Sequence, residues 1–130
     1  MVCTDAADIR RQADDTVSDQ AMRYRVIRAH ISNYPDPVRF AIGDEITIGA
    51  EESRYKGWYR VITRDGNSGW APLQYLDFER GRATHDYSAG ELTTAVDDVL
   101  TELYRLNGWA WMQDVRGDCG WVPLETVVPL

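Results

Sequence analysis

The chain has 130 residues and a net charge of -7, with 44% hydrophobic and 27% charged residues, which is the balance of a water-soluble globular protein. It contains no apolar run long enough to cross a bilayer, and an acidic chain lacks the positive surface that supplies most nucleic-acid affinity. We therefore expect neither a membrane nor a nucleic acid as partner.

The first 22 residues carry two arginines against five aspartates, a net charge of -3, and lack the apolar core of a signal peptide. We therefore expect a cytoplasmic protein. Ile9, Ala13 and Val17 recur four residues apart, which would give a helix only a small apolar face. Two alternatives stay open for residues 1–22, a disordered tail and a short docked helix.

Residues 23–78 form short runs rich in β-branched and aromatic residues, separated by turn residues, as is typical of β-strands joined by tight hairpins. Gly43-Asp44 indicates one sharp turn, and Asp65-Gly66 indicates a hairpin. The expected strand-forming runs are 24–31, 38–42, 43–49, 57–62 and 70–76.

Residues 79–130 have the same organisation and follow a short linker, residues 77–80, without Gly or Pro. Asp97-Asp98 stands in the place of the first turn, and Arg116-Gly117-Asp118 in that of the hairpin. The pattern predicts an all-β fold of two small barrels, residues 23–78 and 79–130, behind an N-terminal tail.

An internal repeat supports this division into two domains. Residues 57–76 and 108–127 align without a gap at an offset of 51, and their identical positions are Gly, Trp, Pro and Leu. Such self-similarity indicates a duplicated structural unit. In the first copy the identical residues are Gly57, Trp58, Gly66, Gly69, Trp70, Pro72 and Leu73.

Both copies resemble the Src-homology-3 (SH3) fold, and in particular small bacterial proteins with tandem SH3-like domains. The motifs that carry this resemblance are VIRAH (26–30), VRFAIGD (38–44), GW (57–58) and GWAPLQYL (69–76), then ATHDY (83–87), ELTTAVDD (91–98), GWAW (108–111) and GWVPLETV (120–127). The resemblance implies a non-catalytic module that binds a protein or peptide ligand, proline-rich or basic, through an aromatic groove.

The resemblance also implies which residues contact the ligand, and it favours the first barrel. Its aromatic and proline candidates are Trp58, Pro72, Tyr75, His30 and Tyr34, and its acidic candidates are Asp36, Glu51 and Glu52. The second barrel offers Tyr87, Trp109 and Pro123. It has Thr126 where the family has Tyr, so we expect weaker proline recognition there, although its acidic residues, Glu91 among them, would suit a basic segment.

Two alternatives to ligand binding stay open. The aromatic faces of the two barrels could bury each other, in a structural or assembly protein, and solvent exposure of Trp58 and Trp109 separates this reading from ligand binding. The chain could also bind cell-wall peptides, as some relatives of the fold do. We expect a monomer or a weak homo-oligomer.

Catalysis is not expected. The two histidines occupy the first strands of the two repeats, and the two cysteines have no histidine nearby, so the sequence offers neither a nucleophile with its base nor a zinc site. We therefore expect no enzyme, no metal and no cofactor.

Overall fold

The computed structural model describes residues 22–32 and 35–130, and these are mostly β-strands without an α-helix. Tyr34 and the expected tail lie outside the described residues. The strands are β1 (Arg23–Val26), β2 (Arg39–Phe40), β3 (Ile46–Glu51), β4 (Trp58–Thr63), β5 (Ser68–Pro72), β6 (Leu76–Asp77), β7 (Arg82–Ala83), β8 (Tyr87–Ser88), β9 (Val99–Leu106), β10 (Trp109–Gln113), β11 (Cys119–Pro123) and β12 (Val127–Pro129). Two single-turn 3-10 helices, η2 (Leu73–Tyr75) and η3 (Leu124–Thr126), precede β6 and β12.

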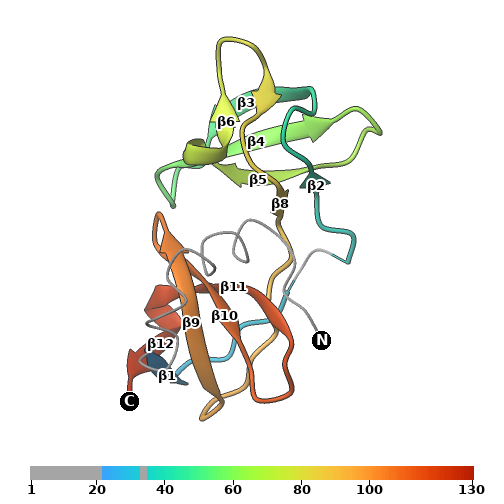
Figure 1. The fold of residues 1–130 in the computed structure, drawn as a ribbon. Coiled ribbons are helices and arrows are strands. Elements are labelled where there is room, and N and C mark those ends of the chain that lie inside the picture. The colour runs from blue at the N-terminus through green and yellow to red at the C-terminus, as the bar shows by residue number, and fades with distance from the viewer. Residues whose placement is uncertain (1–21, 33–34) are drawn as a thin grey trace. The chain divides into compact units, whose positions relative to one another are not determined.

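The chain divides into two compact units that are not consecutive in sequence (Figure 1). Asp36–Ala89 forms one, here called the central unit. The described residues up to Pro35 and from Gly90 onward form the other, the terminal unit. The all-β class is confirmed, whereas the compact units do not follow the expected boundaries 23–78 and 79–130.

The first strand of the first repeat belongs to the terminal unit. There β1 pairs with β9 on one side and with β12 on the other, in a five-stranded sheet of order β11-β10-β9-β1-β12. The alternation in β1 buries Tyr24 and Val26 in the core of that unit. The remaining members of the core cluster are Leu92, Leu100, Ala110, Met112, Val122 and Val127.

The first strand of the second repeat belongs, in turn, to the central unit. Here β7 pairs with β6, and β8 pairs with β2, beside the three-stranded sheet β3-β4-β5. Residues 77–80, expected as a linker, form the turn of the β6–β7 hairpin, where the Asp77 carboxylate accepts hydrogen bonds from the amides of Glu79 and Arg80. The two repeats have exchanged their first strands, and none of the described sheets closes on itself as the expected barrels would.

The likeness of the two first strands permits this exchange. Both VIRAH (26–30) and ATHDY (83–87) present a small or branched apolar residue to a core, with Val26 and Ala83 buried. A strand is stabilised by its cross-strand neighbours and by burial of one face, and either segment satisfies both demands in either unit.

The expected turns are confirmed in both repeats. The Asp44 carboxylate accepts the amide of Ala41, and the Asp98 carboxylate accepts the amide of Ala95, each at 2.9 Å. Gly66 and Gly117 have φ of 90° and 93° in the β4–β5 and β10–β11 hairpins, a conformation that glycine adopts without strain. No helix in the described part of the chain is long and apolar enough to cross a membrane.

Candidate functional site

One cluster in the terminal unit joins an aromatic ring, an imidazole and a carboxylate; it consists of His30, Glu91 and Trp109, and is called the Trp109 cluster. The backbones of His30 and Thr94 exchange hydrogen bonds of 3.2 and 2.8 Å, which places the imidazole. His30 Nε2 lies 2.9 Å from Glu91 Oε1. The imidazole also meets the Trp109 ring edge to face, with 5.6 Å between ring centroids.

Strand geometry places the members of this cluster. Trp109 is the first residue of β10 and pairs with Pro123 at the end of β11. Glu91 forms a parallel bridge to Trp121, which lies two residues before Pro123 on the same strand. His30 and Glu91 are mostly buried and Trp109 is half-buried, so part of the indole faces solvent, and His30 links it to the carboxylate. This combination can hold an apolar group and a cationic group together.

The central unit brings together the other predicted aromatic residues. Tyr75 stacks on His85 with 4.5 Å between ring centroids, and it meets Tyr87 edge to face at 5.9 Å. The Tyr87 hydroxyl donates a 2.8 Å hydrogen bond to the carbonyl of Trp70. Tyr75 comes from the first repeat and Tyr87 from the second, so the strand exchange assembles this cluster too.

These aromatic side chains are buried. Trp58 pairs with Pro72 across β4 and β5, and the exposed fractions of Trp58 and Tyr75 are 5% and 1%. Pro72, Tyr87 and Pro123 are buried as well. The sequence placed Tyr75 and Tyr87 in different barrels and expected Trp58 and Tyr75 at an open surface, whereas in the structure the two tyrosines meet and Trp58 and Tyr75 are buried.

The three acidic candidates of the first repeat form hydrogen bonds with loop residues and not with that aromatic cluster. Glu51 accepts the amide of Gly57, and Glu52 accepts the amide of Arg54, so both carboxylates shape their own loop. Asp36 is exposed, and its carbonyl accepts a 3.1 Å hydrogen bond from the Asn67 side chain. Glu91, expected only as part of an acidic surface, is instead the carboxylate placed beside an aromatic ring.

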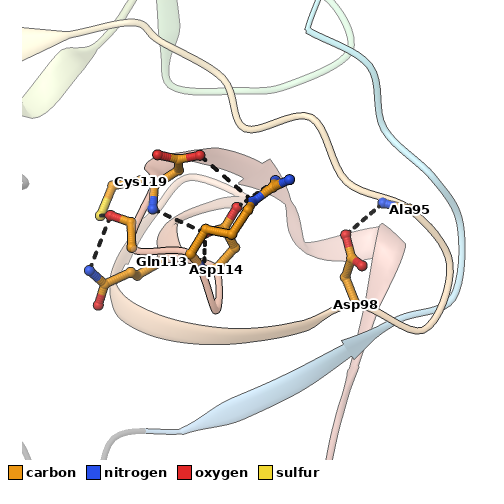
Figure 2. Close-up of polar contacts among 8 residues, drawn as sticks. Ala95, Asp98, Gln113, Asp114 and Cys119 are labelled. Carbon is orange, nitrogen blue, oxygen red and sulfur yellow. Dashed lines mark hydrogen bonds and ion pairs between the residues drawn. The ribbon is translucent and has the colours of Figure 1, made fainter. Parts of the chain in front are cut away.

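A shallow depression of about 360 Å³ lies elsewhere on the terminal unit, between the Asp97-Asp98 turn and the β10–β11 hairpin. Figure 2 shows polar contacts in the turn and in the hairpin, among them the Asp98–Ala95 hydrogen bond and the hydrogen bonds of Asp114. Asp114 accepts hydrogen bonds from the amides of Arg116 and Asp118 and from the Arg116 guanidinium. Burial raises the pKa of Asp114, but these hydrogen bonds outweigh that effect and the pKa lies below its ordinary value. The carboxylate thus serves the hairpin turn.

Metal ligation finds no support in residues 22–32 and 35–130, where no three His, Cys, Asp or Glu side chains gather closely enough to hold an ion.

Comparison with known proteins links part of the chain to a protein family. The family model described as "Variant SH3 domain" matches residues 23–79. No curated protein and no solved structure matches the chain significantly. The family match supports an SH3-like domain in the first repeat, and proteins with such domains generally bind protein or peptide ligands without catalysis. The matched range covers β1 through β6, and therefore strands of both compact units.

Proposed function

We propose that this chain is a non-catalytic protein-binding module that recognises a peptide segment of another protein through the Trp109 cluster. The observation that carries this proposal is the imidazole of His30, which contacts both the half-buried Trp109 ring and the Glu91 carboxylate. In SH3-like domains a tryptophan after the second loop and an acidic residue of the first loop recognise ligands, and Trp109 and Glu91 match those two positions.

The chemistry of the cluster favours an extended ligand with a basic residue. A segment in polyproline II conformation loses little entropy on binding and packs its flat apolar face on aromatic rings. A lysine or arginine of that segment would pair with Glu91, whose carboxylate lies 2.9 Å from the imidazole of His30. We expect the modest affinity that is usual for such contacts, in the micromolar range.

The face of the central unit around Trp58, Pro72 and Tyr75 is the second candidate surface. Its family-like composition supports binding, whereas the 5% exposure of Trp58 favours the alternative in which this residue packs inside the protein. A structural role for the face around Trp58, Pro72 and Tyr75 is therefore the second candidate function. The peptide titration described next tests this face and the Trp109 cluster together.

The test is a titration of the isotope-labelled full chain with a short proline-rich peptide that carries one arginine, followed by NMR. We expect the Trp109 indole and His30 signals to shift, and Trp109→Ala to weaken binding by about tenfold or more. The matched control is Trp58→Ala, at the equivalent position of the other repeat. Folding of each variant is checked by circular dichroism.

A charge variant separates the two parts of the recognition. Glu91→Gln should weaken binding of the arginine peptide and leave a peptide with norleucine in place of arginine unaffected. If neither peptide shifts the Trp109 signals, the proposal is wrong. Shifts at Trp58 and Tyr75 alone would move recognition to the central unit.

A further inference from the structure

The three-stranded sheet β3-β4-β5 of the central unit (Figure 1) has one buried face and one exposed face. Val61 and Ala71 are fully buried and point into the core of the unit. Arg60 and Ile62 flank Val61 in β4 and therefore point to the opposite side, where both are exposed. This side is called the outer face. The residues directly opposite Arg60 and Ile62 on the neighbouring strands belong to it as well: Thr47, Ser68 and Trp70.

Arg60 and Trp70 form the centre of the outer face. They are cross-strand partners, and the guanidinium carbon of Arg60 lies over the Trp70 ring at 5.5 Å from its centroid. The guanidinium also donates a 2.9 Å hydrogen bond to the Ser68 hydroxyl. It forms no ion pair with a carboxylate in the described part of the chain, so most of its five N–H donors stay available. Arg60 is thus held in place with donors left for a ligand.

Two further arginines give the outer face a positive charge. Glu45 lies two residues before Thr47 and therefore extends the outer face. It pairs with Arg64 at 3.8 Å and with Arg82 at 3.5 Å, so one carboxylate serves two guanidinium groups. Together with Arg60, the outer face has three arginines and one glutamate, a net charge of +2 in a chain whose net charge is -7.

Two carboxylates in the hairpins beside these arginines are engaged in their own turns. Asp65 accepts the amide of Asn67 in the β4–β5 hairpin. Asp77 accepts the amide of Arg80 and pairs with its guanidinium at 3.2 Å in the β6–β7 hairpin. Neither carboxylate pairs with an arginine of the outer face, which therefore keeps its excess of positive charge.

The outer face is accessible only in the central unit. The positions equivalent to Arg60 and Trp70 in the terminal unit are Trp111 and Trp121, which are buried. By contrast, Ile62 is 44% exposed. Further along β4 and β5 the outer face is bordered by the buried Trp58–Pro72 pair.

We propose that the outer face is a further docking surface, which binds an acidic amphipathic helix of a partner protein. Tryptophan and arginine around an apolar residue are the composition of interface centres, and a helix is a common second layer on a sheet. Arg60, Ile62 and Arg64 follow one another at steps of two strand residues, about 6.6 Å per step. A helix presents residues four positions apart at about 6 Å. Glutamate, leucine and glutamate at successive steps of four helix positions would therefore face these three residues.

The stack of Arg60 on Trp70 favours a protein over a nucleic acid. A base of a single strand binds by stacking on an open aromatic ring, and the guanidinium already lies over the Trp70 ring. The phosphate backbone would also approach a chain of net charge -7. A carboxylate that reaches the remaining N–H groups of Arg60 requires no change in the stack.

The test is an NMR titration of the isotope-labelled full chain with a short helical peptide that carries glutamate, leucine and glutamate four residues apart and no basic residue. We expect the Trp70 indole and Ile62 methyl signals to shift. The double variant Arg60→Glu, Arg64→Glu should weaken binding by about tenfold or more, because it places like charges opposite each other.

The matched control is the double variant Arg39→Glu, Lys56→Glu, which changes the net charge equally at exposed positions outside the outer face. It should keep the affinity within about twofold, because solvent screens charges at a distance. Folding of both variants is checked by circular dichroism. Equal weakening in the two variants would show attraction to net charge alone and would overturn the proposal, as would a titration without shifts at Trp70 and Ile62.

An oligothymidine titration under the same conditions addresses the other class of ligand, and we expect no shifts from it. Shifts at Trp70 with oligothymidine but not with the peptide would also overturn the proposal. The acidic peptide carries no basic residue for Glu91, so the outer face and the proposed function of the Trp109 cluster are tested separately and fail separately.

Discussion

The two units are built from the same repeat, yet their equivalent sites differ in access. Trp109 in the terminal unit is half-buried and packs against His30, whereas its counterpart Trp58 in the central unit is 5% exposed. The aromatic residue that the family places after the GW-x-P motif is present in the central unit as Tyr75 and absent from the terminal unit. The unit with the less family-like composition therefore has the more accessible tryptophan, which shows that composition alone does not locate a binding face.

The largest expected effect tests the strand exchange that distinguishes these units from simple tandem domains. A protease site inserted between Glu79 and Arg80, both exposed in the β6–β7 turn, permits cleavage of the full chain into two pieces. The first piece contributes β1 to the terminal unit, and the second contributes β7 and β8 to the central unit. Cys119 is disulfide-bonded, so the experiment is run in a reducing buffer. We expect the reduced, cleaved pieces to co-elute in gel filtration and to part only in denaturant.

The uncleaved insertion variant is the control for that experiment. If the pieces elute separately and each keeps its β-sheet circular dichroism, the repeats fold as independent domains and the exchange is wrong.

Sequence analysis predicted the strands and turns but not the exchange of the first strands. Runs of apolar residues and the Asp and Gly turns identified the strands and hairpins, because those features depend on residues close in sequence. The partner of β1 depends on residues that are distant in sequence. His30 and Glu91 are 61 positions apart and meet only because β1 joins the terminal unit, so the Trp109 cluster could not be assembled from either repeat by itself.

A matched pair of glycines offers the next largest effect. Gly120 and Gly69 are equivalent in the repeat, and a Cβ at Gly120 would lie 2.6 Å from the backbone nitrogen of Leu92. At Gly69 it would lie 2.9 Å from a methyl group and 3.3 Å from the Cβ of Val38, so there a side chain rather than the backbone must shift. We expect Gly120→Ala to destabilise the chain by about 3 kcal/mol and Gly69→Ala by about 1 kcal/mol, measured by urea unfolding. Equal losses of unfolding free energy in the two variants would show that the surroundings of Gly69 and Gly120 adapt to a methyl group equally well.

A charged pair specific to the terminal unit should contribute a smaller, pH-dependent part of the free energy of unfolding. Arg105 donates two 2.7 Å hydrogen bonds to the Glu102 carboxylate and one to the Tyr24 hydroxyl on the exchanged strand β1. The bonds from Arg105 hold the pKa of Glu102 below its ordinary value of 4.5. A lowered pKa in the folded state stabilises the protein above pH 4.5, and this stabilisation is lost as the pH falls through the folded value.

Because Arg105 is half exposed, we expect Glu102→Gln to cost about 1 kcal/mol at neutral pH. The difference from the wild type should disappear in acid, and urea unfolding across that pH range measures it. The control is Glu45→Gln in the central unit, whose ion pairs with Arg64 and Arg82 are exposed and should contribute little. A constant difference at every pH would show that Glu102 acts by packing rather than by charge.

The smallest predicted effect concerns a feature in which the two units should be alike. Asp44 and Asp98 each accept the amide of the residue three positions earlier, at 2.9 Å, and each turn is also closed by a 3.0 Å backbone hydrogen bond. Both carboxylate bonds are accessible to solvent, so Asp44→Ala and Asp98→Ala should each cost about 0.5–1 kcal/mol.

The backbone of the two turns differs at one position, because Asp97 has φ of 77° where the central unit has Gly43 at 89°. Asp97→Gly should therefore relieve strain and stabilise the terminal unit by about 0.5 kcal/mol, whereas Gly43→Asp should destabilise the central unit by a similar amount. Thermal unfolding of the four variants measures these differences. Equal costs for the two carboxylates, together with opposite signs for the exchanged Gly and Asp, would show that the turns remain equivalent after duplication and that the units diverge only in what they bury.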